Sequence, residues 1–380
     1  MRWGIGFTST EAERGAPPEM LGRKLMTLMT SSSPHVHGGD SVDKVMLNVI
    51  KALAPATLLS IFLFGWPALL VIVLTVLSCV VMERLTNMLR GRPSTIGDYS
   101  AILTGLLLAL TLPPHSPWWI CVVGGVFAIG VGKSVYGGLG YNMFNPALIA
   151  RVFLLISFPV QLTTWPQISP LFAADSFSLA QSFSIIFAGD YGSVVMDSIT
   201  AATPLGHYRI ETGLGKSVAE ALGGDFGFSF SHSIAGDIGG SLGETSALAL
   251  VAGGIWMIRK GLITWHIPVS MILGTVIPAT VMWLINGDVY PDPLFHLVTG
   301  GLLLGAFFMA TDMVTSPVTP RGMLIFGGLC GVLTYVIRTW GGYPEGVSFA
   351  VVIMNTAVPL IDQYTKPVVY GKSKKEKANA

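Results

Sequence analysis

Residues 104–110 read TGLLLAL and residues 299–304 read TGGLLL, and these two similar stretches decide the fold. Each places a threonine and a glycine before a run of leucines inside a longer apolar segment. Further matches lie at corresponding places in the two halves: paired glycines at 124–125 and 327–328, an aromatic residue before two glycines at 136–138 and 340–342, and the asparagines Asn145 and Asn355. We therefore expect the chain to hold two copies of one helical unit.

Around these stretches the chain contains apolar segments of the length that a membrane-spanning helix needs, about 20 residues for a hydrocarbon core of about 30 Å. The segments in the first half lie at roughly 45–64, 66–84, 98–113, 117–134 and 144–162. Those in the second half lie at roughly 245–258, 262–285, 294–311, 322–339 and 346–364. Each half thus has an odd number of spans, so the second copy must be inverted in the membrane. The fold class that we expect is an all-α polytopic membrane protein, with about ten transmembrane helices in two inverted five-helix repeats.

The composition also indicates a membrane protein. Of the 380 residues, 51% are hydrophobic and 11% are charged, whereas charged residues make up about 25% of an average soluble domain. The 45 glycines suit helices that pack closely in a membrane. The net charge of +1 gives no reason to expect nucleic acid as a partner, and membrane lipid is the expected surrounding.

The expected spans divide the chain into parts. These are a polar N-terminal segment at 1–43, the first repeat at 44–162, a long polar loop at 163–243, the second repeat at 244–365 and a basic tail at 366–380. Basic residues concentrate in the tail and in the loops that would share one side of the membrane with it. By the positive-inside rule, that side and both termini are cytoplasmic. The loop at 163–243 is then periplasmic, and we expect the protein in the inner membrane of a Gram-negative cell.

Within that loop, residues 197–203 read DSITAAT and are followed by Pro204. Thr203 offers a hydroxyl group. Pro204 favours an extended backbone at Thr203, which would present the threonine side chain. Asp197 could orient a metal or the threonine. The alternative interpretation is an ordinary Thr-Pro turn in a surface loop.

The pattern D-x-x-T-A-A-T resembles the flavinylation motif of the membrane subunits of the Rnf and Nqr redox pumps. The resemblance implies that Thr203 carries FMN through a phosphodiester bond, with Asp197 and Thr200 as supporting residues of the motif. It covers the chain from about 45 to 365. The ending Ala-Thr-Pro-Leu at 202–205 is similar to the D subunit of Rnf, whereas the B subunit of Nqr typically has Ser-Gly-Ala-Thr without the proline.

The same resemblance implies a function and partners. An Rnf complex couples electron transfer between ferredoxin and NAD(H) to ion translocation, so this chain is expected to be an oxidoreductase and translocase subunit. The implied partners are Rnf subunits A, B, C, E and G, together with a flavin transferase for maturation. A second, non-covalent flavin such as riboflavin is implied among the helices. The chain has no motif for NAD or for an iron–sulfur cluster, so partners must supply those groups.

Ionisable and amide side chains within apolar segments are costly there, and are therefore candidates for function. Arg151, in the fifth span, could pair with an acid or hold a flavin or quinone oxygen. Asn142 opens the Asn-rich start of that span, where helix capping is favoured and ligand binding is the alternative. Asp312, after the eighth span, is a candidate for the path of Na⁺ or a proton, with an interfacial cap as the equal alternative. Three other acids fit interfacial caps or anchors better: Glu83, Asp98 and Asp362.

Other motifs predict no chemistry, and we expect no hydrolytic catalytic residues. Two Gly-Lys-Ser triplets, at 132–134 and 215–217, lack the preceding glycine that a phosphate-binding loop requires. The three cysteines, Cys79, Cys121 and Cys330, stand far apart in apolar segments and are expected to be small buried hydrophobic residues rather than metal ligands.

Two alternative functions remain open at this point. The B subunit of an Nqr-type quinone reductase would need quinone, and sodium-dependent turnover would support it. A non-redox channel or transporter would explain the inverted repeats and the glycines, but it would leave the motif at 197–203 without a purpose.

Overall fold

The computed structural model describes residues 41–367, except 174–175, 190–202, 224–226, 237–238, 245 and 344. The chain divides into two compact units, Met1–Ser41 and Val42–Ala380, and the fold described below is that of the second. The predictions for the N-terminal segment, for most of the basic tail and for Asp197 and Thr200 lie outside the described residues.

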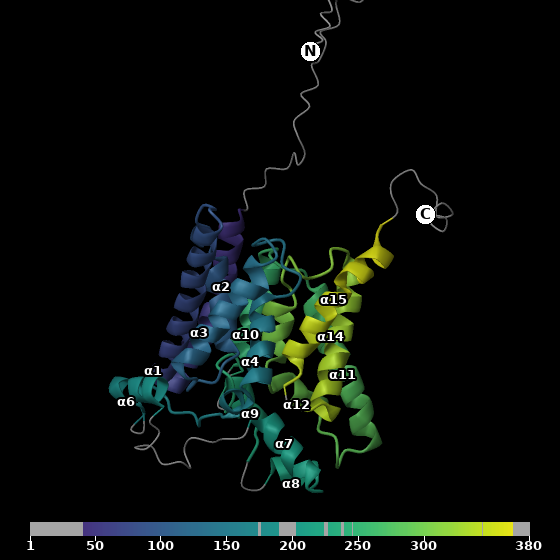
Figure 1. The fold of residues 1–380 in the computed structure, drawn as a ribbon. Helices are drawn as coiled ribbons and strands as arrows, with labels where there is room; N and C mark the ends of the chain where they lie inside the picture. Colours follow the sequence, from purple (N-terminus) through teal and green to yellow (C-terminus); the bar gives the residue numbers. More distant parts are fainter. Residues whose placement is uncertain are drawn as a thin grey trace, which may run out of the picture. The chain divides into compact units, whose positions relative to one another are not determined.

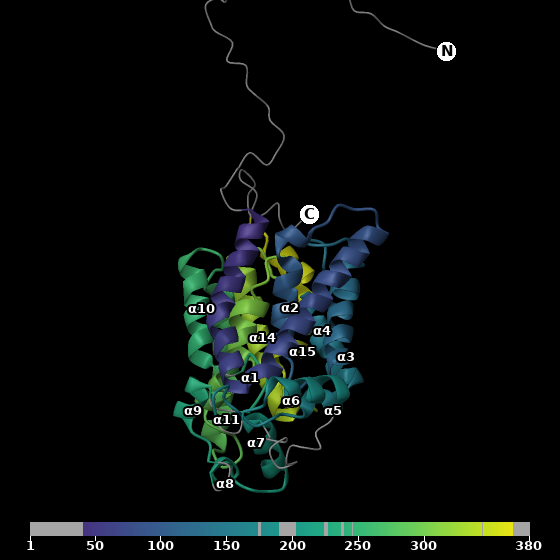
Figure 2. The same ribbon diagram turned by 90° about the vertical axis from the view of Figure 1, so that its left-hand side faces the viewer.

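The first helix, α1, spans Val42–Leu89 and consists of two arms that meet at Gly65. Its 48 residues would measure about 72 Å as one straight rod, more than twice the hydrocarbon thickness of a bilayer. The chain breaks at Gly65, whose φ of 69° suits glycine, and Pro67 stands in the first turn of the second arm, where its missing N–H costs nothing. The arms diverge from this bend (Figure 2) and coincide with the expected spans 45–64 and 66–84.

The remaining helices of the first half are short, and those between residues 96 and 134 pack against α1. They are the 3₁₀ turn η2 (Ile96–Asp98), α2 (Ser100–Leu110), α3 (Trp118–Val126) with its π-helical continuation η3 (Phe127–Ser134), α4 (Pro146–Ser157) and α5 (Pro159–Thr163). A Cβ atom on Gly105 would lie 2.7 Å from the Cα of Val76, so α2 and the second arm of α1 touch through their backbones. Small residues allow helices this close an approach in a membrane.

The second half contains longer helices and one broken helix. They are α10 (Ala247–Arg259), α11 (His266–Ile285), α12 (Pro293–Val298), α13 (Leu302–Leu304) with the π-helical turn η6 (Gly305–Met309), α14 (Pro320–Trp340) and α15 (Val347–Thr365). One hydrophobic core includes buried side chains from both halves, from Leu53 in α1 to Val351 in α15.

The expected polar loop forms several small helices. They are α6 (Leu179–Phe183) with the π-helical turn η4 (Ser184–Ala188), α7 (Pro204–Gly213), α8 (Val218–Leu222) and α9 (Phe230–Ala235). Figure 1 shows them gathered at one end of the helical bundle, opposite the end where α1 begins. The described parts of the segment that carries Thr203 therefore form a folded cap at this end of the bundle.

The prediction of one continuous span at 294–311 is wrong. The helix stops after Val298, and a new helical segment starts at Leu302. Gly300 has a φ of 69°, a conformation that helices do not contain and that glycine adopts readily. Hydropathy alone does not detect such a break, because the residues on both sides of it are apolar.

The prediction of an all-α membrane protein is confirmed at the level of helix content. The described ranges contain helices and no strand. Four helices are long and apolar enough to cross a membrane, namely α1, α11, α14 and α15, and several shorter apolar helices accompany them. The count of about ten spans and their inverted arrangement remain predictions.

The contact between α11 and α14 generates a stability prediction. A Cβ atom on Gly331 would lie 2.2 Å from the carbonyl oxygen of Met271, whereas a Cβ atom on Gly328 would meet nothing within 4 Å. Overpacking of this kind costs about 1–3 kcal/mol, so Gly331→Ala should lower the melting temperature of the purified protein in detergent. Gly328→Ala is the matched control, and equal melting temperatures for the two variants would contradict the described packing.

Candidate functional site

Thr203 lies at the N-cap of α7, directly before the first residue of that helix. Its φ of −62° and ψ of 151° are extended, as the following proline predicted. Its Oγ1 atom accepts a hydrogen bond of 3.1 Å from the backbone N–H of Gly206. The residue is only 7% exposed, so it does not lie on the surface as the alternative of an ordinary turn in a surface loop expected, and its hydrogen bond with Gly206 is that of a helix cap.

A small hollow lies beside Thr203. It encloses about 220 Å³ of empty space and is lined by Trp165, Thr203, Leu205, Glu244, Gly300 and Glu345. These residues come from α7, from the segments that precede α6, α10 and α15, and from the break between α12 and α13. The break in the helix is therefore part of the wall of this site.

A buried arginine and a partly buried glutamate hold the break in place. Arg338 donates from Nη1 to the carbonyl of His296 at 2.7 Å and from Nη2 to the carbonyl of Thr299 at 3.1 Å. Glu345 accepts a hydrogen bond of 3.0 Å from the backbone N–H of Gly301. A helix carries partial negative charge at its carbonyl end and partial positive charge at its amide end. The positive charge of Arg338 lies at a carbonyl end and the negative charge of Glu345 at an amide end, so both are placed favourably.

Arg151 also reaches this site. Its guanidinium Nη2 lies 3.7 Å from Oε2 of Glu345, and its side chain is 2% exposed. The prediction that Arg151 pairs with an acid is confirmed. Its Nη1 atom has no hydrogen-bond partner among the described residues, which leaves one buried donor for a further acceptor.

Helix α7 is fastened to the bundle by its second turn. The guanidinium of Arg209 donates to the carbonyls of Gly341, Tyr343 (3.2 Å) and Arg338 (3.4 Å). The hydroxyl of Tyr208 donates to the carbonyl of Val289 at 2.8 Å. These contacts fix the position of Thr203 relative to the helix break and its charges.

Sequence analysis missed Arg338, Glu244 and Glu345 as members of this site. A charged residue next to an apolar segment is the only local signal that each one offers. Glu244 lies far along the chain from Arg338 and Glu345, and no spacing in the sequence reports that the three residues converge. Asp197 and Thr200, the supporting residues of the motif, lie outside the described residues.

A second, larger hollow lies at the end of the bundle where α1 begins. It encloses about 780 Å³ of empty space, its open mouth included, and its wall contains Asn142, Lys133 and Asp312 among mostly apolar residues. The carboxylate of Asp312 accepts hydrogen bonds from Val314 N and Thr315 Oγ1. The structure thus brings the candidates Asn142 and Asp312 to one cavity. Thr203 lines the other, and Arg151 is linked to that one through its ion pair with Glu345.

The capping interpretations hold for most of the polar residues near helix ends. Asn145 caps α4 by accepting from Ala147 N at 3.0 Å and also donates to the carbonyl of Met309. Asp98 accepts from Ser100 N, and Asp362 accepts from Val318 N. Asn142 differs, because its Oδ1 atom is buried with no hydrogen-bond partner among the described residues.

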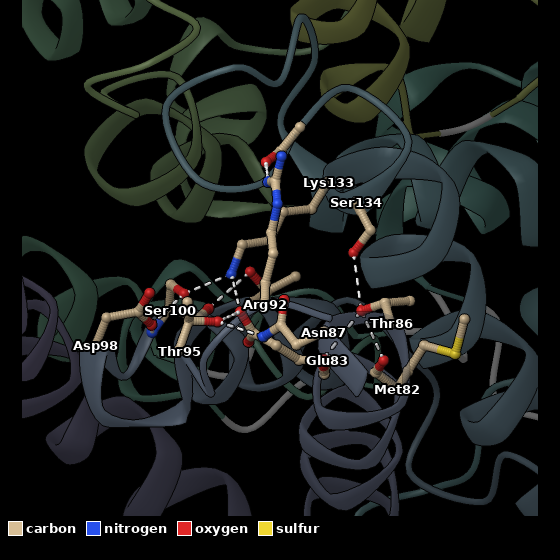
Figure 3. A network of polar contacts seen from close by, with 12 residues as sticks. Met82, Glu83, Thr86, Asn87, Arg92, Thr95, Asp98, Ser100, Lys133 and Ser134 are labelled. Carbon is tan, nitrogen blue, oxygen red and sulfur yellow. Dashed lines mark hydrogen bonds and ion pairs between the residues drawn. The ribbon is translucent and has the colours of Figure 1, made fainter. Parts of the chain in front are cut away.

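The interpretation of Glu83 as an interfacial cap is wrong. Oε1 of Glu83 lies 2.6 Å from Nζ of Lys133, and both side chains are 4% exposed. Figure 3 shows this ion pair at the centre of a polar network, in which Ser100 accepts from Lys133 at 2.6 Å and Thr95 donates to Glu83 at 2.7 Å. Lys133 belongs to one of the two Gly-Lys-Ser triplets, and its role here is to pair with a buried acid.

The three cysteines are buried and free, as expected. Within the described parts of the chain, no group of three or more histidine, cysteine, aspartate or glutamate side chains is placed to hold a metal ion.

The buried ion pair gives a prediction about stability. Lys133→Met leaves the carboxylate of Glu83 buried without its cation, which costs about 3–5 kcal/mol for a broken buried pair. Adding Glu83→Gln should restore most of that loss, because the isolated charge is then removed as well. Thermal unfolding of the two single variants and the double variant in detergent measures this coupling, and additive losses would contradict the pairing.

Comparison with known proteins identifies relatives along almost the whole chain. The model of the NQR2, RnfD, RnfE family matches residues 29–371. A protein of Stutzerimonas stutzeri, named as the D subunit of an ion-translocating oxidoreductase complex, is 48% identical over 338 residues, which cover 89% of this chain and 94% of the relative. Proteins of the same name from Escherichia fergusonii and Halorhodospira halophila are 42% and 41% identical, over 92% and 90% of this chain and 100% and 95% of the relatives.

Both the extent of the family match and these identities exceed what a shared helical composition would produce. The chain belongs to the NQR2, RnfD, RnfE family.

Proposed function

We propose that this chain is the D subunit of an Rnf-type complex, which couples electron transfer between ferredoxin and NAD(H) to ion translocation. The relatives described above all carry the name of the D subunit of an ion-translocating oxidoreductase complex. Those names favour the Rnf interpretation over the B subunit of Nqr. The helix content supports a membrane subunit, and the partners in this proposal are Rnf subunits A, B, C, E and G.

The proposed cofactor is FMN, bound to Thr203 through a phosphodiester bond and attached by a flavin transferase. The observation that carries this proposal is the place of Thr203 at the N-cap of α7. A phosphate on its Oγ1 would stand at the amide end of a helix, where unpaired N–H groups and the helix dipole stabilise negative charge. The hydrogen bond from Gly206 N to Oγ1 shows that an N–H group of the first turn of α7 already faces this oxygen.

Two carboxylates line the hollow, Glu244 and Glu345, and the positive charges that would offset a phosphate come from the neighbouring arginines. The unpartnered Nη1 of Arg151 and the unpartnered Nε of Arg338 are buried donors near the hollow, and buried donors without partners favour a ligand that offers acceptor atoms. The hollow is too small for a whole FMN even with its open mouth included, so the rest of the cofactor must extend beyond it. When bound, FMN would supply the redox chemistry, and the protein would hold it and set its electrostatic surroundings.

We propose that the larger hollow holds the second, non-covalent flavin, riboflavin. Its wall is mostly apolar with a few polar groups, as the walls of small-molecule sites are. Apolar residues such as Leu107, Phe307 and Phe308 supply the wall, and the unpartnered Oδ1 of Asn142 can accept a hydrogen bond from a flavin ring. Asp312, in the same wall, remains the candidate for the ion path.

The proposed topology has about ten spans in two inverted repeats in the bacterial inner membrane, with both termini cytoplasmic. The end of the bundle that carries α7 is then periplasmic, and the end with the larger hollow is cytoplasmic. Electrons would thus pass between two flavins on opposite sides of the membrane within one subunit.

The covalent cofactor can be tested with one threonine. With the flavin transferase co-expressed, the denatured wild-type protein should show flavin fluorescence in a gel, and Thr203→Val should abolish it because the attacking hydroxyl is absent. Thr212→Val removes another hydroxyl of the same helix and should keep the fluorescence. A fluorescent Thr203→Val variant, or a dark wild type, would contradict the proposal.

A further inference from the structure

Thr203 is buried, although its proposed modification requires a transferase to reach its hydroxyl. The residue is 7% exposed, and its Oγ1 atom accepts a hydrogen bond from the backbone N–H of Gly206. In the modification, Oγ1 forms a bond to the phosphorus of the FMN half of FAD, and the bond from that phosphorus to the bridging oxygen breaks. AMP leaves, and the hydroxyl proton passes to a base of the transferase or to water. The attacking oxygen must approach the phosphorus to about 3–3.5 Å, in line with the leaving oxygen.

The hollow beside Thr203 does not admit FAD. With its open mouth included it encloses about 220 Å³ of empty space, which is too little for FMN alone and therefore also for the larger FAD. Glu244 and Glu345 line it together with Thr203, and a pyrophosphate beside carboxylates is electrostatically unfavourable. This arrangement is therefore closed to the modification, and part of the wall around Thr203 must move before Oγ1 can react.

Helix α7 is the part of the wall that can move as a unit. Its side chains Leu205 and Tyr208 pack with Phe295 in a small hydrophobic cluster, which side chains of α8 and of the segment after it complete and which is separate from the main core. Figure 1 and Figure 2 both show α7 and α8 as the outermost helices at this end of the bundle. Peripheral elements of this kind open at a lower free energy than the core does.

The side chain of Arg209 fastens α7 to the bundle. Its guanidinium donates hydrogen bonds to the carbonyls of Gly341, Tyr343 and Arg338. These carbonyls lie in the last turn of α14 and in the segment that follows it, and a positive charge is favourable next to the carbonyl end of a helix. Hydrogen bonds from a charged donor are also stronger than those from a neutral one, so the loss of this one side chain should weaken the attachment of α7.

We propose that α7 moves between this docked position and a lifted position, and that a flavin transferase modifies Thr203 only in the lifted position. Arg209 sets the fraction of molecules in which α7 is lifted, so it is a positioning residue of the modification and not a reactant. The proposal rests on the proposed function, which supplies the modification, whereas the movement of α7 can be measured without it. After the transfer, the docked position returns the modified threonine to a buried place, away from the transferase.

Thiol labelling measures the movement without any flavin. Thr203→Cys places a thiol at the buried position, and its reaction with a maleimide reports how often that position opens. In the purified full-length protein in detergent, adding Arg209→Met should accelerate this reaction at least tenfold, which corresponds to about 1.4 kcal/mol. Methionine keeps the apolar part of the side chain and removes the donors. The protein without Thr203→Cys gives the background from the three native cysteines, which are buried.

Lys216→Met is the matched control. It also removes one positive charge near α7, but the Lys216 side chain is 55% exposed and pairs with Glu211 of α7 itself, so the labelling rate should stay unchanged. Tyr208→Phe removes only the hydroxyl that donates to the carbonyl of Val289, and it should accelerate labelling less than Arg209→Met does. This milder variant keeps the test decisive if Arg209→Met fails to fold.

The modification itself is then followed on protein that was expressed without the transferase. Purified transferase and FAD are added to the folded protein, and flavin fluorescence in denaturing gels gives the initial rate of transfer. The rate should rise in Arg209→Met by a factor similar to that for thiol labelling, because both reactions need the lifted position. It should stay at the wild-type value in Lys216→Met.

Equal labelling of Thr203→Cys with and without Arg209→Met would overturn the proposal, and so would equal or slower transfer of FMN to Arg209→Met than to the wild type. Absence of transfer to every folded protein, with fluorescence present after co-expression, would also overturn it, since FMN would then be attached before α7 docks for the first time. Accelerated labelling with no covalent flavin under either condition would overturn the proposed function instead, so the two failures are distinguishable.

Discussion

The site at Thr203 depends on one break in a helix, between α12 and α13. A break inside a membrane domain leaves carbonyl groups at one helix end and amide groups at the other without helical partners. Arg338 satisfies carbonyls of the first end, and Glu345 satisfies an amide of the second. Glu345, which stabilises the break, is therefore also one of the two carboxylates that line the hollow.

The break also brings distant parts of the chain close together. A Cβ atom on Gly300 would lie 2.6 Å from Nη2 of Arg338 and 2.8 Å from a methyl carbon of Leu205. Only glycine allows both the backbone conformation and this approach. Because Arg209 holds α7 against the end of α14, Thr203 is fixed relative to the charges. A cofactor on Thr203 would meet an environment that is already ordered, which is the condition for electrostatic control of a redox group.

The sequence predicts a helical membrane protein because the length of an apolar segment can be read directly from consecutive residues. It also makes Thr203 a candidate, since the motif around it is contiguous, and the structure shows that residue at the N-cap of α7. The sequence does not predict the break at Gly300, because leucines follow it and hydropathy stays high. Nor does it predict the pairing of Glu83, whose partner Lys133 lies 50 residues away along the chain. Contacts of this kind arise from packing, and a single sequence contains no direct signal for them.

The central claim is that Thr203 is the attachment point of a redox cofactor beside a buried cluster of charges. Peptide mass spectrometry of the protein, co-expressed with its flavin transferase and digested, tests it most directly. The account predicts that the peptide containing Thr203 carries the mass of FMN less one water, with fragment ions that place it on that residue. An unmodified Thr203, or FMN attached to another residue, would contradict the account.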